Sequence, residues 1–305
     1  MSVQNGGGFA QASARIGFNL AALAGTRLLS LVLTLVQMGI IFRALDVEGR
    51  GQFGFSLQFA SLFTVAATLG IQRLLVRDIA RNPSAAWDLA WTACTVVAVL
   101  SGLVFAVITG LAFFIEDTPP ARAAIMLAAV WTVVLWAWQQ PFEAMLLARE
   151  RMGLVSIANA AGAVLKLGAV WVLMAHFPSS AAAHGAIALA TGAALLLCMG
   201  FAVRVHGWQA PHLRPCAALA QVRECFPFAA AMLFSQIYFK SDMSLLKFLS
   251  GDVAAGVYTP PQRVIEPLLM MASLWGTAVF PALCRFSHAA PDDYLQLKRT
   301  SLRMV

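Results

Sequence analysis

Long apolar stretches alternate with short polar turns along most of this chain. A helix that crosses a membrane needs about 20 consecutive apolar residues, and lipid admits only helices and closed barrels as spanning structures. Unbroken apolar runs favour helices over the alternating pattern of barrel strands. We therefore predict an all-α, polytopic transmembrane bundle of about eight helices. The predicted spans are residues 16–42, 51–72, 87–115, 123–148, 154–176, 182–206, 226–250 and 262–286.

The connection after the sixth run is the longest, and it contains the helix-breaking residues Gly207 and Pro211. We interpret residues 207–225 as a cytoplasmic linker between two lobes. Residues 1–206 form a complete six-helix lobe, and residues 226–305 hold two helices and the start of a third.

An internal repeat supports this division. The turn at 45–53, after the first run, is similar to the turn at 249–258, after the seventh, and Gly51 matches Gly256 at an offset of 205 positions. Transporter folds are often built from such repeats. A full second lobe would need on the order of one hundred further residues, so we expect the chain to be truncated at its C-terminus.

The composition agrees with a membrane protein. Hydrophobic residues make up 60% and charged residues 11%, whereas soluble domains are about half apolar and about a quarter charged. These values exclude an ordinary soluble enzyme and a disordered chain, and five dispersed cysteines exclude a disulfide scaffold. The net charge of +7 comes with no nucleic-acid-binding motif, so we expect no nucleic-acid partner.

The basic residues of the loops set the orientation. One alternate set of connections carries eleven Arg and Lys residues and the other carries three. Positively charged loops stay in the cytoplasm, so we expect a multi-pass protein of the bacterial cytoplasmic (inner) membrane with its N-terminus inside. The richer set consists of Arg73, Arg77, Arg81, Arg149, Arg151, Arg204, Arg214, Arg223, Arg285, Lys298 and Arg299. The poorer set consists of Arg43, Arg50 and Arg122.

Polar and ionisable side chains inside the spans are the candidate functional residues. An ionised group costs about 2.5–3.5 kcal/mol at the membrane centre and usually faces a bundle interior or a hydrated cavity. The predicted substrate-binding residues of such a cavity are Arg27, Lys166, Lys240 and Lys247. The predicted orienting or coupling residues are Asp242, Gln37, Asn159 and Gln236.

Helical periodicity groups these residues on polar faces. Arg27 and Gln37 lie on one arc of about 100° in the first span, and Gln236, Lys240 and Lys247 lie within about 80° in the seventh. The alternative for each charged group is an ion pair that only balances charge inside the bundle. Small residues in the fifth span also let a neighbouring helix approach closely.

The cationic excess inside the spans favours an anionic substrate such as a phosphate or pyrophosphate. The sequence contains no Gly-x-Ser-x-Gly, Walker or His-Glu-x-x-His motif, and its histidines lack ligand spacing. We interpret Glu116 and Asp117 as solvated loop charges. We therefore expect no catalytic residue, no cofactor and no metal site.

Several short segments of the sequence are distinctive. In the first half they are FRALD at 42–46, GQFG at 51–54, LGI at 69–71, RDIAR at 77–81 and ARER at 148–151. In the second half they are YFKSD at 238–242, GVY at 256–258 and FPAL at 280–283. Together these segments resemble polysaccharide-biosynthesis proteins, the Wzx-type oligosaccharide flippases of the multidrug/oligosaccharidyl-lipid/polysaccharide (MOP) exporter superfamily.

The resemblance implies a MATE-like fold of two six-helix lobes around a central cavity, with alternating access. It also implies that a polyprenyl-pyrophosphate-linked oligosaccharide is moved from the cytoplasmic to the outer leaflet. The expected partners are this lipid-linked glycan, the bilayer and polysaccharide polymerase machinery. Two other functions stay open: a cation-coupled drug or metabolite exporter of the same superfamily, and a membrane enzyme of glycan assembly.

Overall fold

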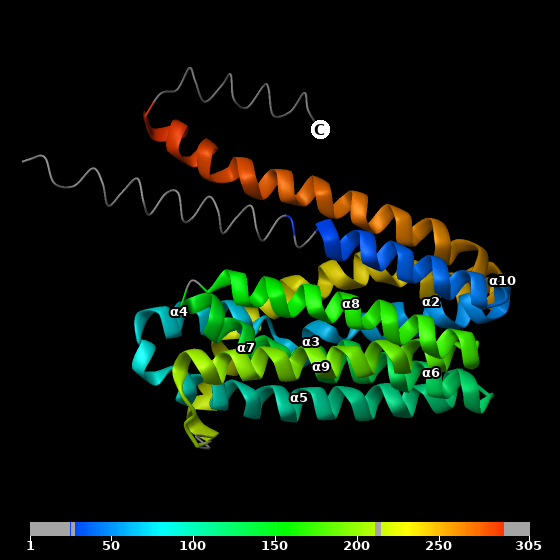
Figure 1. Ribbon diagram of the computed structural model, residues 1–305, viewed down its shortest axis with the longest axis horizontal. Helices are drawn as coiled ribbons and strands as arrows, with labels where there is room; N and C mark the ends of the chain where they lie inside the picture. Colours follow the sequence, from blue (N-terminus) through cyan, green and yellow to red (C-terminus); the bar gives the residue numbers. More distant parts are fainter. Residues whose placement is uncertain (1–24, 26–27, 150, 211–214, 290–305) are drawn as a thin grey trace, which may run out of the picture. The chain divides into compact units, whose positions relative to one another are not determined.

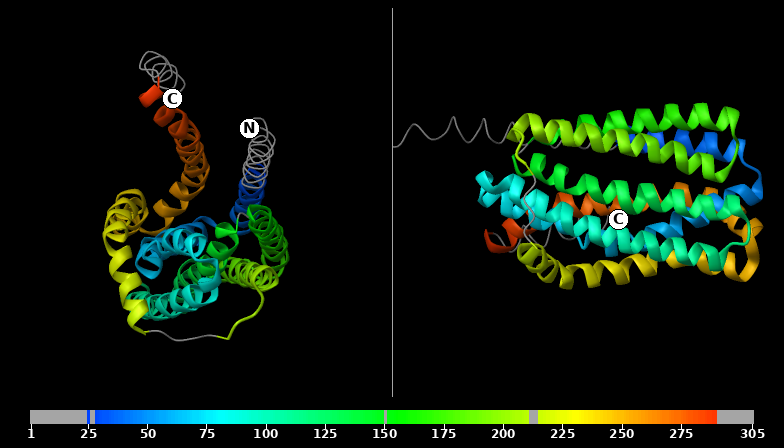
Figure 2. Two further views of the ribbon diagram at one scale, coloured as in Figure 1. Left: turned by 90° about the vertical axis from the view of Figure 1, so that its left-hand side faces the viewer. Right: turned by 90° about the horizontal axis from the view of Figure 1, so that it is seen from below.

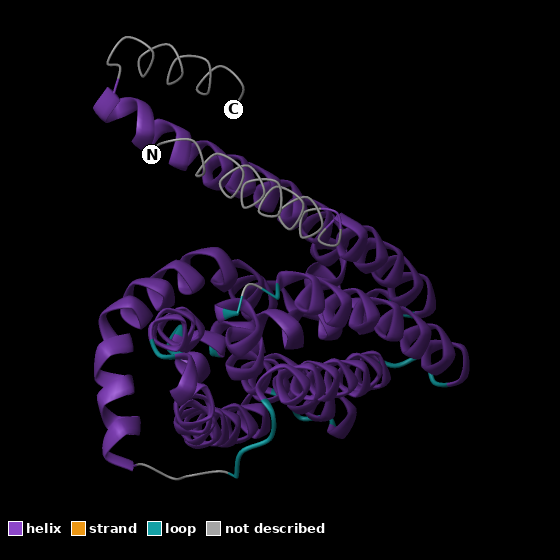
Figure 3. Cartoon of the chain, turned by 60° about the vertical axis from the view of Figure 1, so that its left-hand side comes forward, coloured by secondary structure: helices purple, strands orange, loops and turns teal. Residues whose placement is uncertain are grey.

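The computed structural model describes residue 25 and residues 28–149, 151–210 and 215–289 (Figure 1). The chain divides into two compact units, up to Thr259 and from Pro260 onward. The described part consists of helices and loops without a strand (Figure 3). The predicted all-α class is confirmed.

The helices follow one another with short connections. A first helix, Leu28–Ala44, continues the first predicted span. The next are α2 (Val47–Leu62), α3 (Thr64–Thr68), α4 (Ile71–Arg81), the 3₁₀ turn η1 (Pro83–Ala85) and α5 (Ala86–Ile115). The remainder are α6 (Pro119–Ala129), the π-helical turn η2 (Val130–Leu135), α7 (Trp136–Ala148), α8 (Met152–His176), α9 (Ser180–His206) and α10 (Pro215–Ala289).

Four stretches of helix are long and apolar enough to cross a membrane, and they confirm the third to sixth predicted spans. They are Pro83–Ile115, Pro119–Ala148, Met152–His176 and Ser180–His206. The second predicted span is broken: α2 and the α3–α4 segment meet at a bend of 40° and together could form a fifth crossing. Leu69 and Gly70 both adopt left-handed backbone angles between α3 and α4, so the helix cannot run straight through this point.

The seventh and eighth predicted spans both fall within α10. This helix is interrupted at Gly251, whose φ of 78° and extended ψ are not helical. It begins at Pro215, inside the segment expected to be a linker, because proline fits the first turn of a helix. Within the residues searched, α10 is not among the helices that are long and apolar enough to cross. The count of eight spans therefore stays a prediction.

The turns gather at two ends of the first unit (Figure 2). At one end, Ser180 donates a hydrogen bond to Gln52 (3.3 Å) and Lys247 pairs with Glu116; we call this the predicted outer end. At the other, the Trp87 indole donates to the Gly207 carbonyl (2.6 Å); we call this the predicted inner end. The alternation of connections expected from the loop charges is thus present, and which end faces the cytoplasm stays a prediction.

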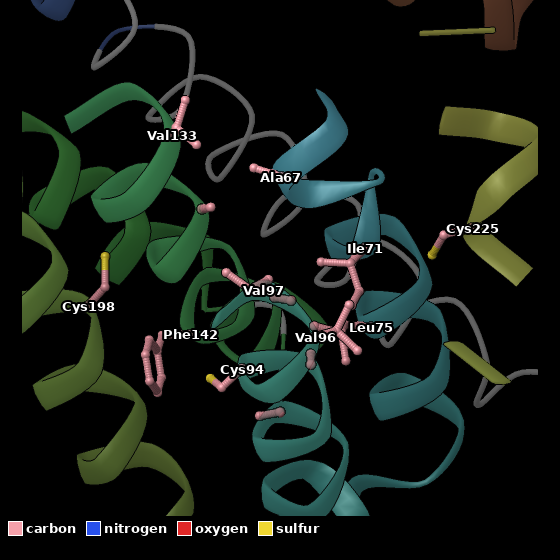
Figure 4. Close-up of a cluster of buried hydrophobic side chains, with 14 of the residues drawn as sticks. Ala67, Ile71, Leu75, Cys94, Val96, Val97, Val133, Phe142, Cys198 and Cys225 are labelled. Carbon is pink, nitrogen blue, oxygen red and sulfur yellow. The ribbon is translucent and has the colours of Figure 1, made fainter. Parts of the chain in front are cut away.

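Close helix packing holds this unit together. Ile71 and Leu75 of α4 lie in one buried cluster with Val96 and Val97 of α5 (Figure 4). Alanines fill much of the rest of this cluster. Between membrane helices such small residues allow close approach, and the resulting van der Waals contacts replace the hydrophobic driving force of water. The cluster packs α4, α5 and α7 against one another. These helices carry several of the polar side chains described below.

Small residues also allow α8 and α9 to pack closely side by side (Figure 1). Gly162 is buried in α8, and a Cβ atom placed on it would lie 3.0 Å from the Ala194 Cβ of α9. The predicted packing role of small residues in the fifth span is confirmed at this position. One polar face of α8 lies against α7, and Asn159 on this face contacts Gln139 and Glu143 of α7.

Candidate functional site

The predicted cations lie in different surroundings, and one of them cannot be placed. Arg27 lies outside the described residues. Lys166 of α8 lies 5.9 Å from the centre of the Trp131 ring. The Lys240 ammonium of α10 donates to the Gln58 side-chain oxygen (3.0 Å), and Lys247 of α10 is ion-paired. The predicted lining of one common cavity therefore stays a prediction.

Lys247 lies between two carboxylates at the predicted outer end. Its ammonium pairs with Glu116 and with Asp252, whose Oδ1 is 2.9 Å away, and it lies 4.3 Å from the centre of the Phe55 ring. The side chains of Lys247 and Glu116 are only 9% and 11% exposed. We call Lys247, Glu116 and Asp252 the outer ion cluster.

This arrangement bears on two expectations. Two carboxylates pair with the Lys247 ammonium, and its predicted contact with substrate stays a prediction. Glu116 is not a solvated loop charge, because it is buried where α5 ends, whereas the neighbouring Asp117 is exposed as expected. Glu116 and Lys247 are 131 positions apart in the sequence and meet only in the folded chain. Their pairing could therefore not be predicted from the local sequence pattern.

Two glycines meet beside the outer ion cluster. A Cβ atom on Gly51 would overlap the carbonyl of Asp252, and one on Gly256 would overlap the carbonyl of Val47. Val47 and Gly51 match Asp252 and Gly256 at the same offset of 205 positions. The two turns of the sequence repeat therefore pack against each other reciprocally, each glycine against the residue that opens the other helix. Only glycine permits backbones to approach so closely.

Lys240 and Asp242 of α10 form hydrogen bonds with residues of α2 and α10. Gln58, which accepts from Lys240, is fully buried in α2. The Tyr258 hydroxyl donates to Asp242 Oδ2 (2.7 Å), and the Met243 amide donates to Asp242 Oδ1 (2.8 Å). The proposed role of Asp242 in orienting a basic side chain stays a prediction. Of the other predicted orienting residues, Gln37 is buried, Gln236 is half-buried and Asn159 is exposed.

A buried histidine network lies next to Lys166. The Trp131 indole donates to His184 Nδ1 (3.2 Å), so His184 carries its proton on Nε2 and donates to the Ser56 hydroxyl (2.7 Å). Phe53 stacks on the imidazole at 4.5 Å, and His184 is completely buried. His184 could not be singled out from the sequence, because its partners come from two other helices.

The sequence reasoning also missed a carboxylate inside the fourth span. Glu143 of α7 accepts hydrogen bonds from the side-chain amides of Gln72 (2.9 Å), Gln139 (3.0 Å) and Asn159 (3.3 Å). We call these four residues the Glu143 amide cluster. One signal was present in the sequence: Gln139 precedes Glu143 by four positions, so both lie on one face of a helix. Asn159, predicted as an orienting residue, is the contribution of α8.

The polar groups of this unit thus include paired and unpaired charges, but no grouping of metal-ligating acids, histidines and cysteines in the described part of the chain.

Comparison with known proteins gives one result. The family model described as "Polysaccharide biosynthesis protein" matches residues 16–287. No curated protein and no solved structure matches the chain significantly. The match spans most of the sequence, including both turns of the repeat and all the helices that carry the polar clusters. The chain belongs to the polysaccharide biosynthesis protein family.

Proposed function

We propose that this protein is a flippase that moves a polyprenyl-pyrophosphate-linked oligosaccharide from the cytoplasmic to the outer leaflet by alternating access. The family match over residues 16–287 is the observation that carries the proposal. Family members take part in polysaccharide synthesis or transport and are generally transporters. The several apolar helices are consistent with a multi-pass membrane protein.

The chemistry of the spans supports a pyrophosphate-bearing substrate. Charges on a pyrophosphate cannot cross bare hydrocarbon, so a polar path with compensating cations is required. Lys166 is the clearest candidate, because no carboxylate pairs with it among the described residues and its ammonium lies over the Trp131 ring. We assign substrate contact to Lys166, Lys240 and Arg27, and we assign Lys247 to the outer ion cluster instead.

The predicted outer end supports alternating access. α2 and α10 are joined there by backbone contact at Gly51 and Gly256, and α10 is joined to the end of α5 by the outer ion cluster. Release of a glycan to the outer leaflet requires these contacts to separate. Ion pairs and glycine contacts can separate and re-form without unfolding a helix, so the outer ion cluster would serve as a reversible closure.

The proposal is tested by the leaflet distribution of the lipid-linked oligosaccharide in cells that lack the gene. We expect the oligosaccharide to accumulate on the cytoplasmic side and to return to the outer leaflet when the wild-type gene is restored. Restoration with Lys166→Ala should leave most of it inside at equal protein level. The matched control is Arg43→Ala, which removes an exposed cation near the predicted outer end. An unchanged distribution on deletion would refute the flippase function.

A further inference from the structure

Glu143 of α7 accepts side-chain hydrogen bonds through both of its carboxylate oxygens. Its Oε2 accepts from the Gln72 amide, and its Oε1 accepts from the amides of Gln139 and Asn159. Gln72 comes from α4, Gln139 from α7 and Asn159 from α8. Three helices thus converge on one carboxylate.

The charge on this carboxylate has no opposite charge beside it. Within the described part of the chain, no Lys, Arg or His forms an ion pair with Glu143, and its hydrogen-bond donors are neutral amides. Glu143 lies in a helix that is long and apolar enough to cross a membrane. Charged groups in such helices usually pair with each other or mark an ion pathway. A net negative charge here attracts a cation.

The surrounding groups can supply the ligands for one. A carboxamide presents either its nitrogen or its oxygen after a half-turn of its terminal bond. With that half-turn, Gln72, Gln139 and Asn159 would place amide oxygens around the Glu143 carboxylate. Carboxylate and amide oxygens are hard ligands that favour hard cations over transition metals. A single negative charge matches a monovalent cation, because divalent sites use a higher count of charged ligands.

We propose that the Glu143 amide cluster is a binding site for a monovalent hard cation of the sodium class. The site lies near the predicted inner end, because Glu143 is about 8 Å along the helix axis from Ala148. Binding depends only on these four residues and is independent of the proposed flippase function. Any coupling of the cation to transport would rest on that function.

The test is direct binding to the purified full-length chain in detergent, with Na⁺ as the probe. The melting temperature is measured in increasing NaCl, with choline chloride keeping the ionic strength constant, and ²²Na⁺ binding is measured in parallel. We expect a saturable rise in melting temperature and saturable ²²Na⁺ binding. Glu143→Gln, which keeps the side-chain size, should abolish both. Asn159→Ala should weaken Na⁺ binding about tenfold, or about 1.4 kcal/mol.

The matched control is Asp88→Asn, which removes a carboxylate from the same end of a neighbouring span. It should leave Na⁺ binding unchanged. Asn159→Ala also serves if Glu143→Gln does not fold, because Asn159 is exposed and its loss leaves little to repack. The proposal is overturned if the wild-type protein shows no difference between Na⁺ and choline. It is equally overturned if both variants keep wild-type Na⁺ binding.

Discussion

The outer ion cluster and the Glu143 amide cluster differ in the partners that surround their carboxylates. Both hold carboxylates inside a helical bundle. In the outer ion cluster, Lys247 lies between Glu116 and Asp252, so one ammonium group pairs with both carboxylates and offsets one of their two negative charges. In the Glu143 amide cluster, neutral amides satisfy the hydrogen-bonding capacity of the carboxylate and leave its charge in place.

The difference indicates different roles. An ion-paired side chain is stabilised by its partner, so we expect it to bind cations from solution only weakly. A group that is satisfied by hydrogen bonds alone keeps an electrostatic field that a cation can neutralise. We therefore expect the outer ion cluster to determine the stability of the closed outer end, and the Glu143 amide cluster to determine the response to cations.

The largest effect is expected from a side chain at the reciprocal glycine contact that supports the outer cluster. Gly51→Val places a branched side chain against the Asp252 carbonyl. Because backbone must move to make room, we expect a loss of about 3 kcal/mol or more in the free energy of unfolding. The measurement is SDS-induced unfolding of the purified protein. Gly102→Ala is the control, since nothing lies within 4 Å of its added Cβ. Equal stability of the two variants would contradict the close contact.

The next effect tests the balance of charge in the outer ion cluster. Lys247→Met keeps the length of the side chain but leaves Glu116 and Asp252 without their cation. Breaking a buried ion pair by removing one partner costs about 3–5 kcal/mol, and the partial exposure of Asp252 puts our expectation at about 2–3 kcal/mol. The double variant Lys247→Met with Glu116→Gln should recover part of the loss. If the double variant is no more stable than Lys247→Met alone, the two side chains are not coupled.

A smaller effect on stability is expected at Glu143. Glu143→Gln keeps an acceptor for the neighbouring amides and removes a charge that no described Lys, Arg or His pairs with, so we expect a change of about 1 kcal/mol or less in the free energy of unfolding. The same SDS titration measures it. A loss as large as that of Lys247→Met would mean that Glu143 is chiefly a structural group, and it would break the comparison between the two clusters.

The smallest effect is expected next to Glu116. Asp117 is exposed, so Asp117→Asn should change the unfolding free energy by less than about 0.5 kcal/mol. Glu116→Gln in the same assay should cost more, because Glu116 is buried against Lys247. Equal effects of the two substitutions would show that the pairing of Glu116 contributes nothing measurable.

The sequence predicted the features that depend on local pattern. Four spans follow from runs of apolar residues, and the structure contains a long apolar helix at each of them. The repeat at 45–53 and 249–258 was visible as a match of glycines, and the structure shows these glycines in reciprocal contact. In each case the information lies within a few neighbouring positions or in a direct repetition of them.

The sequence did not predict features that join distant helices. The partner of Glu116 is 131 positions away, and Glu143 is surrounded from α4 and α8 as well as from its own helix. The break at Leu69 and Gly70 was also missed, because hydropathy continues across it while the backbone does not. Polar pairing of this kind depends on tertiary geometry, which helical periodicity within one span does not contain.

Alternating access through the predicted outer end is most directly tested by locking that end shut. Cysteines at Glu116 and Lys247, in a background whose native cysteines are replaced, would be joined by a short, reducible thiol cross-linker in cells. We predict that cross-linking holds the lipid-linked oligosaccharide in the cytoplasmic leaflet and that reduction releases it. Continued translocation at the uncross-linked rate, with the cross-link shown to be complete, would contradict the account.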